Sequence, residues 1–348
     1  MKVIPISVAK EDVTAYKIIA NKIIEHAEIV VNFFDYCNMR CSFCPQNHED
    51  KQGITREEIL SKTEHILEWV EKNENTNLFL LHLMGGELFQ DDLIDNGILE
   101  HFSEFINILE SKKRIGTTLQ YNFITNLVFE RTNEVIDFLN KHDLKIAISY
   151  DPTGRFNKEQ FNVFKRNVEI FKPYIRLYSC VLSQKSMEKV MRGDVYYDYL
   201  YNLFDCHWDH LLVGDDNIDV LLPTEQDITD FYIHLVKYYP KVLNVEQFLH
   251  KNKTQKMSCT RGNSLTIFSD NSIPIGCSGS VVLKNPKTVN NWSSEIVNNF
   301  LDEKMCLTCE YFSRCNLTCF INNDHKNLVK NPEGCPYKLV FDYVESTR

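Results

Sequence analysis

Hydrophobic and polar residues follow two alternating periods between residues 28 and 220. Residues 28–34 form an apolar, β-branched run typical of a buried strand, and residues 55–72 repeat apolar positions every three to four residues, as a helix does. Thr55 and Glu58 fit a capping box at the start of that helix. Further strands are predicted at 77–83, 117–126, 144–150, 175–182 and 210–213, and further helices at 92–111, 133–142, 158–172 and 184–203.

Strands that alternate with helices predict βαβ units around a parallel sheet. Six such units fit an α/β fold, a partial (β/α)6 barrel of the TIM type, whose functional residues lie at the carboxyl ends of the strands. The alternation stops after about residue 255, where cysteines become dense. We expect an N-terminal extension (1–27), a barrel core (28–220), a helical connector (221–258) and a small C-terminal cysteine-rich domain (259–348), with boundaries placed to within about four residues or more.

Composition restricts the classes of function. The chain has 348 residues, a net charge of −10 and 12 cysteines. The negative charge argues against a nucleic-acid groove, which needs a basic stripe. No apolar run reaches the length of a membrane span or a signal peptide, so we expect a cytoplasmic protein without a membrane partner. Cytoplasmic thiols stay reduced, and metal or cluster ligation then explains the cysteines better than disulfides do.

Three cysteines, Cys37, Cys41 and Cys44, follow the first predicted strand in a C-x3-C-x2-C spacing. Three thiolates can hold three corners of a [4Fe–4S] cluster and leave the fourth iron open to a small molecule. Zinc is the alternative, but zinc sites usually pair two C-x2-C knuckles, or one knuckle with two histidines, and only His48 is near. With Phe43 before the last cysteine, the motif resembles the signature of the radical S-adenosylmethionine (radical SAM) enzymes.

A second motif, Gly85-Gly86-Glu87, follows the second predicted strand. Glycines let a backbone approach a ligand closely, and a carboxylate can hold an ammonium group. Taken alone, the motif also fits an ordinary turn. One strand after the cysteine loop, it resembles the radical SAM motif that grips the methionine amino group, although Leu88 replaces the usual proline.

Residues near other strand ends agree with this resemblance. It implies that Ser149 and Asp151, after the fourth strand, face the ribose hydroxyls and that Phe43 packs near the adenine. Asn126 closes the third strand as it does in many relatives. Ser149, Asp151 and Asn126 also fit plain turn or cap chemistry.

The C-terminal cysteines form a third motif. Its C-x2-C-x5-C-x3-C core resembles the SPASM extension, which binds auxiliary iron–sulfur clusters, and a zinc ribbon is the alternative. The resemblance implies one complete auxiliary [4Fe–4S] cluster held by Cys306, Cys309, Cys315 and Cys335. It implies a second auxiliary [4Fe–4S] cluster, with substrate, a non-cysteine residue or solvent as its fourth ligand, held by Cys259, Cys277 and Cys319. Ser278 stands where sulfatase maturases carry an aspartate, which disfavours that activity.

Two cysteines lie outside these motifs. Cys180 falls in a predicted strand and is expected to be a buried thiol. Cys206 opens the stretch Cys-His-Trp-Asp-His, which contains metal-ligand residues but is more typical of a loop with satisfied side chains. No side-chain acid or base stands out as a further catalytic group.

The resemblance covers about residues 28–345 and implies an oxidoreductase that reductively cleaves S-adenosylmethionine to a 5′-deoxyadenosyl radical. The radical is expected to take a hydrogen atom from a peptide or protein side chain, which leaves a crosslink or an oxidised residue in a ribosomally made peptide. A small-molecule dehydrogenase of antibiotic or cofactor biosynthesis is the alternative. A non-catalytic cluster carrier is a third hypothesis, and the Gly-Gly-Glu motif argues against it.

The same resemblance implies a peptide substrate and a flavodoxin or ferredoxin-type electron donor. Only 27 residues precede the first predicted strand, too few for an independent leader-binding domain. A peptide leader is therefore expected to bind directly or through a separate protein, or to be absent.

Overall fold

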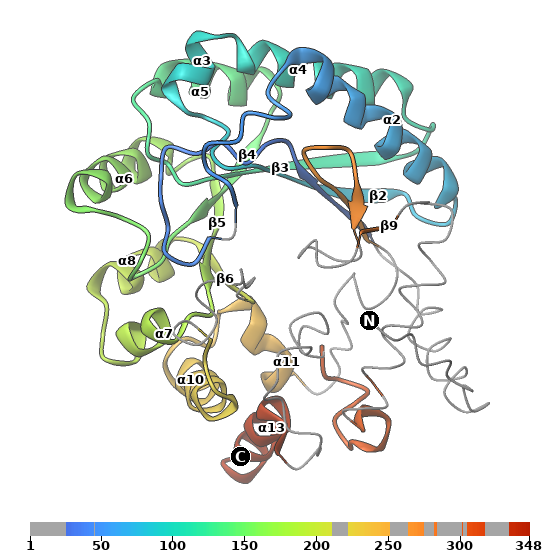
Figure 1. Cartoon of the computed structure of the whole chain (residues 1–348). Helices are drawn as coiled ribbons and strands as arrows, with labels where there is room; N and C mark the ends of the chain where they lie inside the picture. The colour runs from blue at the N-terminus through green and yellow to red at the C-terminus, as the bar shows by residue number, and fades with distance from the viewer. Residues whose placement is uncertain are drawn as a thin grey trace.

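The computed structural model describes residues 26–44, 46–210, 222–250, 264–274, 282–283, 301, 305–316 and 334–348. Seven parallel strands form one curved sheet with helices along its outer side (Figure 1). In spatial order β6-β5-β4-β3-β2-β1-β7, the strands are β1 (Ala27–Asn32), β2 (Leu78–Met84), β3 (Thr118–Thr125), β4 (Lys145–Ser149), β5 (Ile175–Val181), β6 (Asp205–Asp209) and β7 (Ser264–Ile267). The predicted α/β fold with a partial TIM-type barrel is confirmed.

Helices connect the successive strands of the barrel. They are α2 (Arg56–Lys72), α3 (Asp91–Asp95), α4 (Ile98–Lys112), α5 (Thr132–Lys141), α6 (Lys158–Phe171), α7 (Gln184–Met191) and α8 (Val195–Leu203). The predicted capping box at Thr55 is present. The helix expected over 92–111 is two helices, because Gly97 takes a φ of 83° and turns the chain between them. Within the described ranges, no helix has the length and apolar character needed to cross a membrane.

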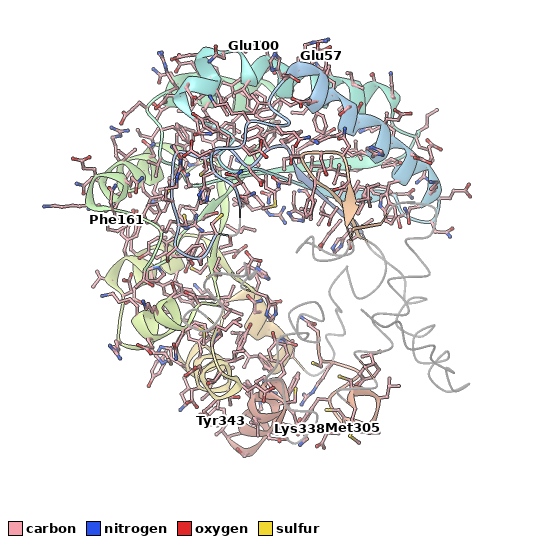
Figure 2. The ribbon with its side chains drawn as sticks, in the orientation of Figure 1. Glu57, Glu100, Phe161, Met305, Lys338 and Tyr343 are labelled. Atoms are coloured by element: carbon pink, nitrogen blue, oxygen red, sulfur yellow. The ribbon has the colours of Figure 1, made fainter. Side chains whose placement is uncertain are left out.

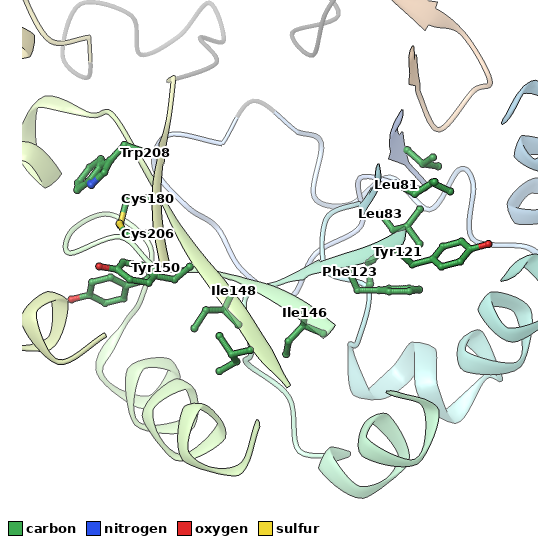
Figure 3. Close-up of a cluster of buried hydrophobic side chains, with 14 of the residues drawn as sticks. Leu81, Leu83, Tyr121, Phe123, Ile146, Ile148, Tyr150, Cys180, Cys206 and Trp208 are labelled. Atoms are coloured by element: carbon green, nitrogen blue, oxygen red, sulfur yellow. The ribbon is translucent and has the colours of Figure 1, made fainter. Parts of the chain in front are cut away.

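Each strand buries the face that the helices cover. Ile29 on β1 is fully buried, and Figure 3 shows the same apolar face continuing from Leu81 on β2 to Trp208 on β6. Aromatic rings fill the space between sheet and helices. The Phe123 ring packs edge-on against the Phe138 ring of α5, with centroids 5.4 Å apart. The hydrophobic core of the barrel therefore lies outside the sheet.

The concave face of the sheet carries polar side chains, because successive residues of a strand point to opposite faces. His82 on β2 and Asn122 on β3 stand opposite each other, with Asn122 Nδ2 3.4 Å from His82 Nδ1. His207 and Asp209 on β6 form a pair, with Nδ1 3.0 Å from Oδ1. This face is the inner surface of the barrel, where a polar molecule finds donors and acceptors.

The sixth strand lies earlier than predicted. The strand expected at 210–213 is wrong at its start, since β6 runs over Asp205–Asp209, and residues 211–213 lie outside the described residues. Cys206 and Trp208 are buried, and the Trp208 ring lies 4.6 Å from Phe231 on α10 (Glu225–Tyr238). The stretch from Cys206 is thus a strand rather than a loop. Its alternation of apolar and polar residues is the signal that indicates this.

A segment that follows the predicted connector adds a further strand to the barrel sheet. β7 pairs with β1, with Leu265 opposite Ile29. The connector contains α10, the short turn η1 (Leu243–Val245) and α11 (Glu246–Leu249), and both helices pack against α13 (Pro336–Ser346) at the C-terminus (Figure 1). The remaining short elements are β8 (Ile273–Pro274), β9 (Val282–Leu283) and η4 (Cys306–Thr308). The domain boundaries stay a prediction.

Lys62 fastens α2 to the turn that follows β7. Its side chain is fully buried, and Nζ donates hydrogen bonds to the Phe268 carbonyl (2.8 Å), the Ser269 carbonyl (3.1 Å) and Asn271 Oδ1 (3.0 Å). Burial lowers the pKa of Lys62 to about 8. One ammonium group therefore satisfies three acceptors of this turn.

Replacing Lys62 with methionine should lower the free energy of unfolding by about 1–3 kcal/mol at neutral pH, because three acceptors lose their donor. The loss should grow between about pH 8 and 10.5. In that range the unfolded chain binds the Lys62 proton and the folded wild type does not, so Lys62 adds stability as the pH rises. Urea unfolding of the apoprotein measures both effects. Lys72→Met is the control, since Lys72 lies on the same helix with its side chain 48% exposed. Equal losses in the two variants would contradict the assigned role.

Candidate functional site

The cysteine loop leaves β1 at the carboxyl end of the sheet. Phe33 continues the strand pairing, because its N–H donates to the Met84 carbonyl at 2.9 Å. The chain then passes through Cys37, which is 8% exposed, to the half-buried Cys41 and Cys44. Burial and the nearby Glu87 carboxylate raise the pKa of the Cys37 thiol, and Cys41 and Cys44 add smaller contributions in the same direction. The structure therefore brings the three predicted ligands together on one loop.

Backbone hydrogen bonds hold this loop in shape. The Cys37 N–H donates to the His48 carbonyl at 3.1 Å, and the Cys44 N–H donates to the Cys41 carbonyl at 3.2 Å. The Met39 N–H donates to Cys37 Sγ at 3.4 Å, a contact that favours the thiolate. His48 thus contributes its backbone carbonyl to the loop.

The donor set fits a cluster with three thiolate ligands. Burial raises the pKa of Cys37 to about 12 and also raises the pKa of Cys41 and Cys44, so a metal centre must displace their protons to bind. In the part of the chain that the structure describes, no three His, Cys, Asp or Glu side chains surround a point where a single metal ion could sit. Three soft thiol ligands on one loop fit three corners of a [4Fe–4S] cluster.

Gly85 and Gly86 are required by the cysteine loop itself. The Gly86 N–H donates to the Phe34 carbonyl at 2.7 Å, and the Glu87 N–H donates to the Tyr36 carbonyl at 3.1 Å. A Cβ at Gly86 would lie 2.1 Å from the Tyr36 carbonyl oxygen, and one at Gly85 would lie 2.9 Å from that of Phe34. Only glycine permits this approach, so the motif after β2 and the cysteine loop form one packed unit.

Glu87 is an internal anchor. Its side chain is buried, and its carboxylate accepts hydrogen bonds from the Phe89 N–H (3.0 Å), the Thr125 hydroxyl (2.7 Å) and the Asn126 N–H (2.6 Å). Burial raises the pKa of Glu87, and these donors oppose that shift. Both oxygens of the Glu87 carboxylate therefore accept hydrogen bonds from the protein. These hydrogen bonds join the end of β2 to the end of β3.

Asn126 extends the connection to the cysteine loop. It is buried, its Nδ2 donates to Asn38 Oδ1 at 2.9 Å, and its Oδ1 accepts from the Val128 N–H at 2.8 Å. Asn38 lies one residue after Cys37. The end of β3 therefore holds the loop beside its first cysteine.

Arg155, shortly after the end of β4, is a site residue that the sequence analysis missed, and it is paired with the predicted Asp151. Asp151 is buried, and its carboxylate accepts from the Val181 N–H and from Arg155 Nε, each at 2.7 Å. The Arg155 guanidinium lies over the Phe43 ring, 5.1 Å from its centroid. The i, i+4 spacing of Asp151 and Arg155 after a strand end is the signal that could have identified the pair. Ser149 is half-buried and stands opposite Ser179 of β5.

The described C-terminal cysteines gather near the start of α13. Cys335 forms the N-cap of this helix, and burial raises its pKa, with a smaller contribution from the Cys309 thiol. Cys315 and Cys335 both raise the pKa of Tyr337, on the first turn of the helix. Cys306 begins η4. Three predicted ligands lie outside the described residues: Cys259, Cys277 and Cys319.

Residues 305–316 are held against α13 by polar contacts. The Tyr311 hydroxyl donates to Asp342 at 2.7 Å, Arg314 pairs with Glu345, and Lys338 lies 3.5 Å from Glu310. Figure 2 labels Lys338 and Met305 at this same end of the molecule. The segment with three cysteines and the helix with the fourth are therefore fixed to each other.

The two remaining cysteines are packed into the core. Cys180 is fully buried, as predicted, and Cys206 is 1% exposed, with its Sγ 3.5 Å from the Tyr197 hydroxyl. Figure 3 shows the two thiols side by side on the apolar face of the sheet. They stand apart from the residues of the cysteine loop.

No protein-family model and no curated protein matches the chain. Solved structures share its fold. The anSMEcpe structure with bound AdoMet has a TM-score of 0.68 at 16% identity, over 92% of this chain and 97% of that chain. With AdoMet and the Kp18Cys peptide bound, the TM-score is again 0.68 at 16% identity, over 92% and 98%. Streptococcus suis SuiB bound to precursor peptide SuiA has a TM-score of 0.54 at 16% identity, over 91% and 77%. The resemblance expected from the motifs is thus confirmed for the fold.

Replacing Glu87 with glutamine should lower the free energy of unfolding by about 1–3 kcal/mol, because the new amide group turns a donor toward the N–H of Phe89 or Asn126. The cysteine loop should loosen as well, so Cys37 should react faster with an alkylating reagent in the apoprotein. Urea unfolding and mass-spectrometric mapping of alkylation measure the two effects. Glu134→Gln is the control, since the Glu134 side chain is 47% exposed on α5. A Glu87→Gln protein as stable and as protected as the control would show that the anchor is dispensable.

Proposed function

We propose that this chain is a radical SAM enzyme, an oxidoreductase that modifies a side chain of a ribosomally made peptide. The observation that carries the proposal is the docking of the cysteine loop onto Gly86 and Glu87 at the carboxyl ends of β1 and β2. Barrel enzymes place their active sites at this edge. The fold that the chain shares with AdoMet-bound anSMEcpe supports the proposal.

Cys37, Cys41 and Cys44 would hold a [4Fe–4S] cluster and leave one iron open. When bound, the cluster and S-adenosylmethionine supply an electron and a 5′-deoxyadenosyl radical, which removes a hydrogen atom from the substrate. The protein holds the reacting groups in place and keeps water away. Gly86 holds the loop from β2, and Asn126 holds it from β3.

We assign the contacts with S-adenosylmethionine to residues beside the cysteine loop. The Gly85 carbonyl already accepts from Gln46 Nε2 at 3.4 Å but has a second lone pair, and Arg155 lies over the Phe43 ring. The backbone carbonyls of Gly85 and Gly86 would accept from the amino group, the Ser149 hydroxyl would face the ribose, and Phe43 would lie near the adenine. Glu87 and Asp151 would shape the site, because protein donors already engage both of their carboxylates.

A peptide substrate suits the concave face of the barrel. Asn122 is buried there, and its Oδ1 has no hydrogen-bond partner in the part of the chain that the structure describes. A peptide N–H could satisfy this oxygen, which is otherwise costly to bury. Two of the structurally similar proteins have been solved with peptides, anSMEcpe with Kp18Cys or Cp18Cys and SuiB with precursor peptide SuiA. The product would be a crosslink or an oxidised residue.

The C-terminal cysteines would hold two auxiliary [4Fe–4S] clusters. The gathering of Cys309, Cys315 and Cys335 at α13 supports the first of them, with Cys306 as its fourth ligand. The second would use Cys259, Cys277 and Cys319. A flavodoxin or ferredoxin-type protein would deliver the electron.

Iron and sulfide analysis after anaerobic reconstitution tests the architecture. The wild type should contain about 12 iron atoms per chain, and the Cys37→Ala/Cys41→Ala/Cys44→Ala variant about 8, because each cubane holds about 4. The reduced wild type should also convert S-adenosylmethionine to 5′-deoxyadenosine, and the variant should not. About 4 iron atoms together with bound zinc would mean that the C-terminal domain is a structural zinc module. A wild type that binds no S-adenosylmethionine would overturn the enzyme proposal.

A further inference from the structure

We propose that Arg155 is a positioning residue that fastens the cysteine loop to the end of β4 and raises the reduction potential of the cluster on Cys37, Cys41 and Cys44. This inference rests on the proposed function, since it assigns a role toward that cluster.

Arg155 is anchored from two strand ends. Its Nε donates to Asp151 Oδ2 at 2.7 Å, and the other oxygen of that carboxylate accepts from the Val181 N–H of β5, also at 2.7 Å. The Asp151 side chain is 0% exposed, and the Arg155 side chain is 12% exposed. The guanidinium is therefore held in one orientation, with the carboxylate on its Nε side.

The opposite side of the guanidinium meets the cysteine loop. Arg155 Nη1 lies 3.9 Å from Cys41 Sγ, and the guanidinium covers the Phe43 ring. The preceding residue, Gly154, adds a backbone contact, because its carbonyl accepts from the Ser42 N–H at 2.9 Å. Gly154 has a φ of 78°, and a Cβ there would lie 2.5 Å from Ser42 Oγ. Three successive residues of the cysteine loop, Cys41 to Phe43, thus contact either Gly154 or Arg155 in the turn after β4.

The position of the charge predicts its effect on the cluster. Reduction adds one negative charge to a cluster, and a nearby cation stabilises the more negative state. Water screens a buried cation only weakly, so Arg155 acts more strongly than an exposed arginine at the same separation. The planar, forked guanidinium can also engage carboxylate, sulfur and ring together, whereas the single ammonium of lysine cannot.

The test compares Arg155→Met and Arg155→Lys in the reconstituted full-length protein. Its readout is the midpoint potential of the cluster signal that the Cys37→Ala/Cys41→Ala/Cys44→Ala variant lacks, followed by electron paramagnetic resonance. Arg155→Met should shift the reduction equilibrium at least tenfold toward the oxidised cluster, about 59 mV for a one-electron couple. Arg155→Lys should keep a midpoint potential close to that of the wild type, because lysine carries the same charge. It should lose iron to a chelator faster, because the single ammonium cannot engage carboxylate, sulfur and ring together.

Arg40→Met is the matched control. Arg40 lies on the same loop and carries the same charge, but its side chain is 54% exposed. The Arg40→Met variant should therefore shift the midpoint potential of the cluster much less than Arg155→Met does.

Each outcome bears on the inference. A wild-type potential in Arg155→Met, with weaker binding of S-adenosylmethionine, would overturn it and make Arg155 a ligand of that molecule instead. If Arg155→Met retains no cluster, Arg155→Lys decides, and a tenfold shift in the lysine variant would overturn the role of the charge. Absence of the signal from the wild type would be a failure of the proposed function, which is distinct from an unshifted potential in the variant.

Discussion

The two hydrogen bonds that Gly86 and Glu87 donate to the cysteine loop are the contact on which the whole site depends. They join two successive strand-to-helix connections through their backbones, at a distance that leaves no room for a Cβ on Gly86. The Glu87 carboxylate then extends the unit to β3, and Asn126 returns it to the loop. Backbone and side-chain contacts of the protein itself therefore fix the position of the loop that carries the three cysteines.

The division between the two faces of the sheet follows from the same strand geometry. Large apolar side chains such as Phe123 and Trp208 pack under the helices, which leaves the alternate positions of each strand to polar residues. One face of the sheet thereby contributes the hydrophobic core, and the opposite face contributes the polar side chains inside the barrel. A residue such as His82 can change without opening the hydrophobic core, whereas its strand neighbours Leu81 and Leu83 cannot.

The elements were predictable where local pattern decides the structure. The alternation of strands and helices, the capping box at Thr55 and the position of the cysteine loop all depend on residues close in sequence. β6 was misplaced because a strand of five residues rich in His and Asp has little apolar signal beyond Cys206 and Trp208. The i, i+4 spacing of Asp151 and Arg155 is a local signal for that pair, but the contacts of Arg155 with Cys41 and Phe43 form only in the folded barrel, so no local pattern contains them. The pairing of β7 with β1 is long-range in the same sense.

The attachment of α13 separates the supports of the two groups of cysteines. Cys335 stands at the N-cap of this helix, and the surface that receives the helix belongs to α10 and α11. Its Tyr337 ring packs 5.3 Å from Tyr232 of α10, in the connector that follows β6. The Cys37 loop is held instead by residues at the ends of β2, β3 and β4. A change that loosens the connector helices would therefore displace Cys335 and leave the Cys37 loop in place.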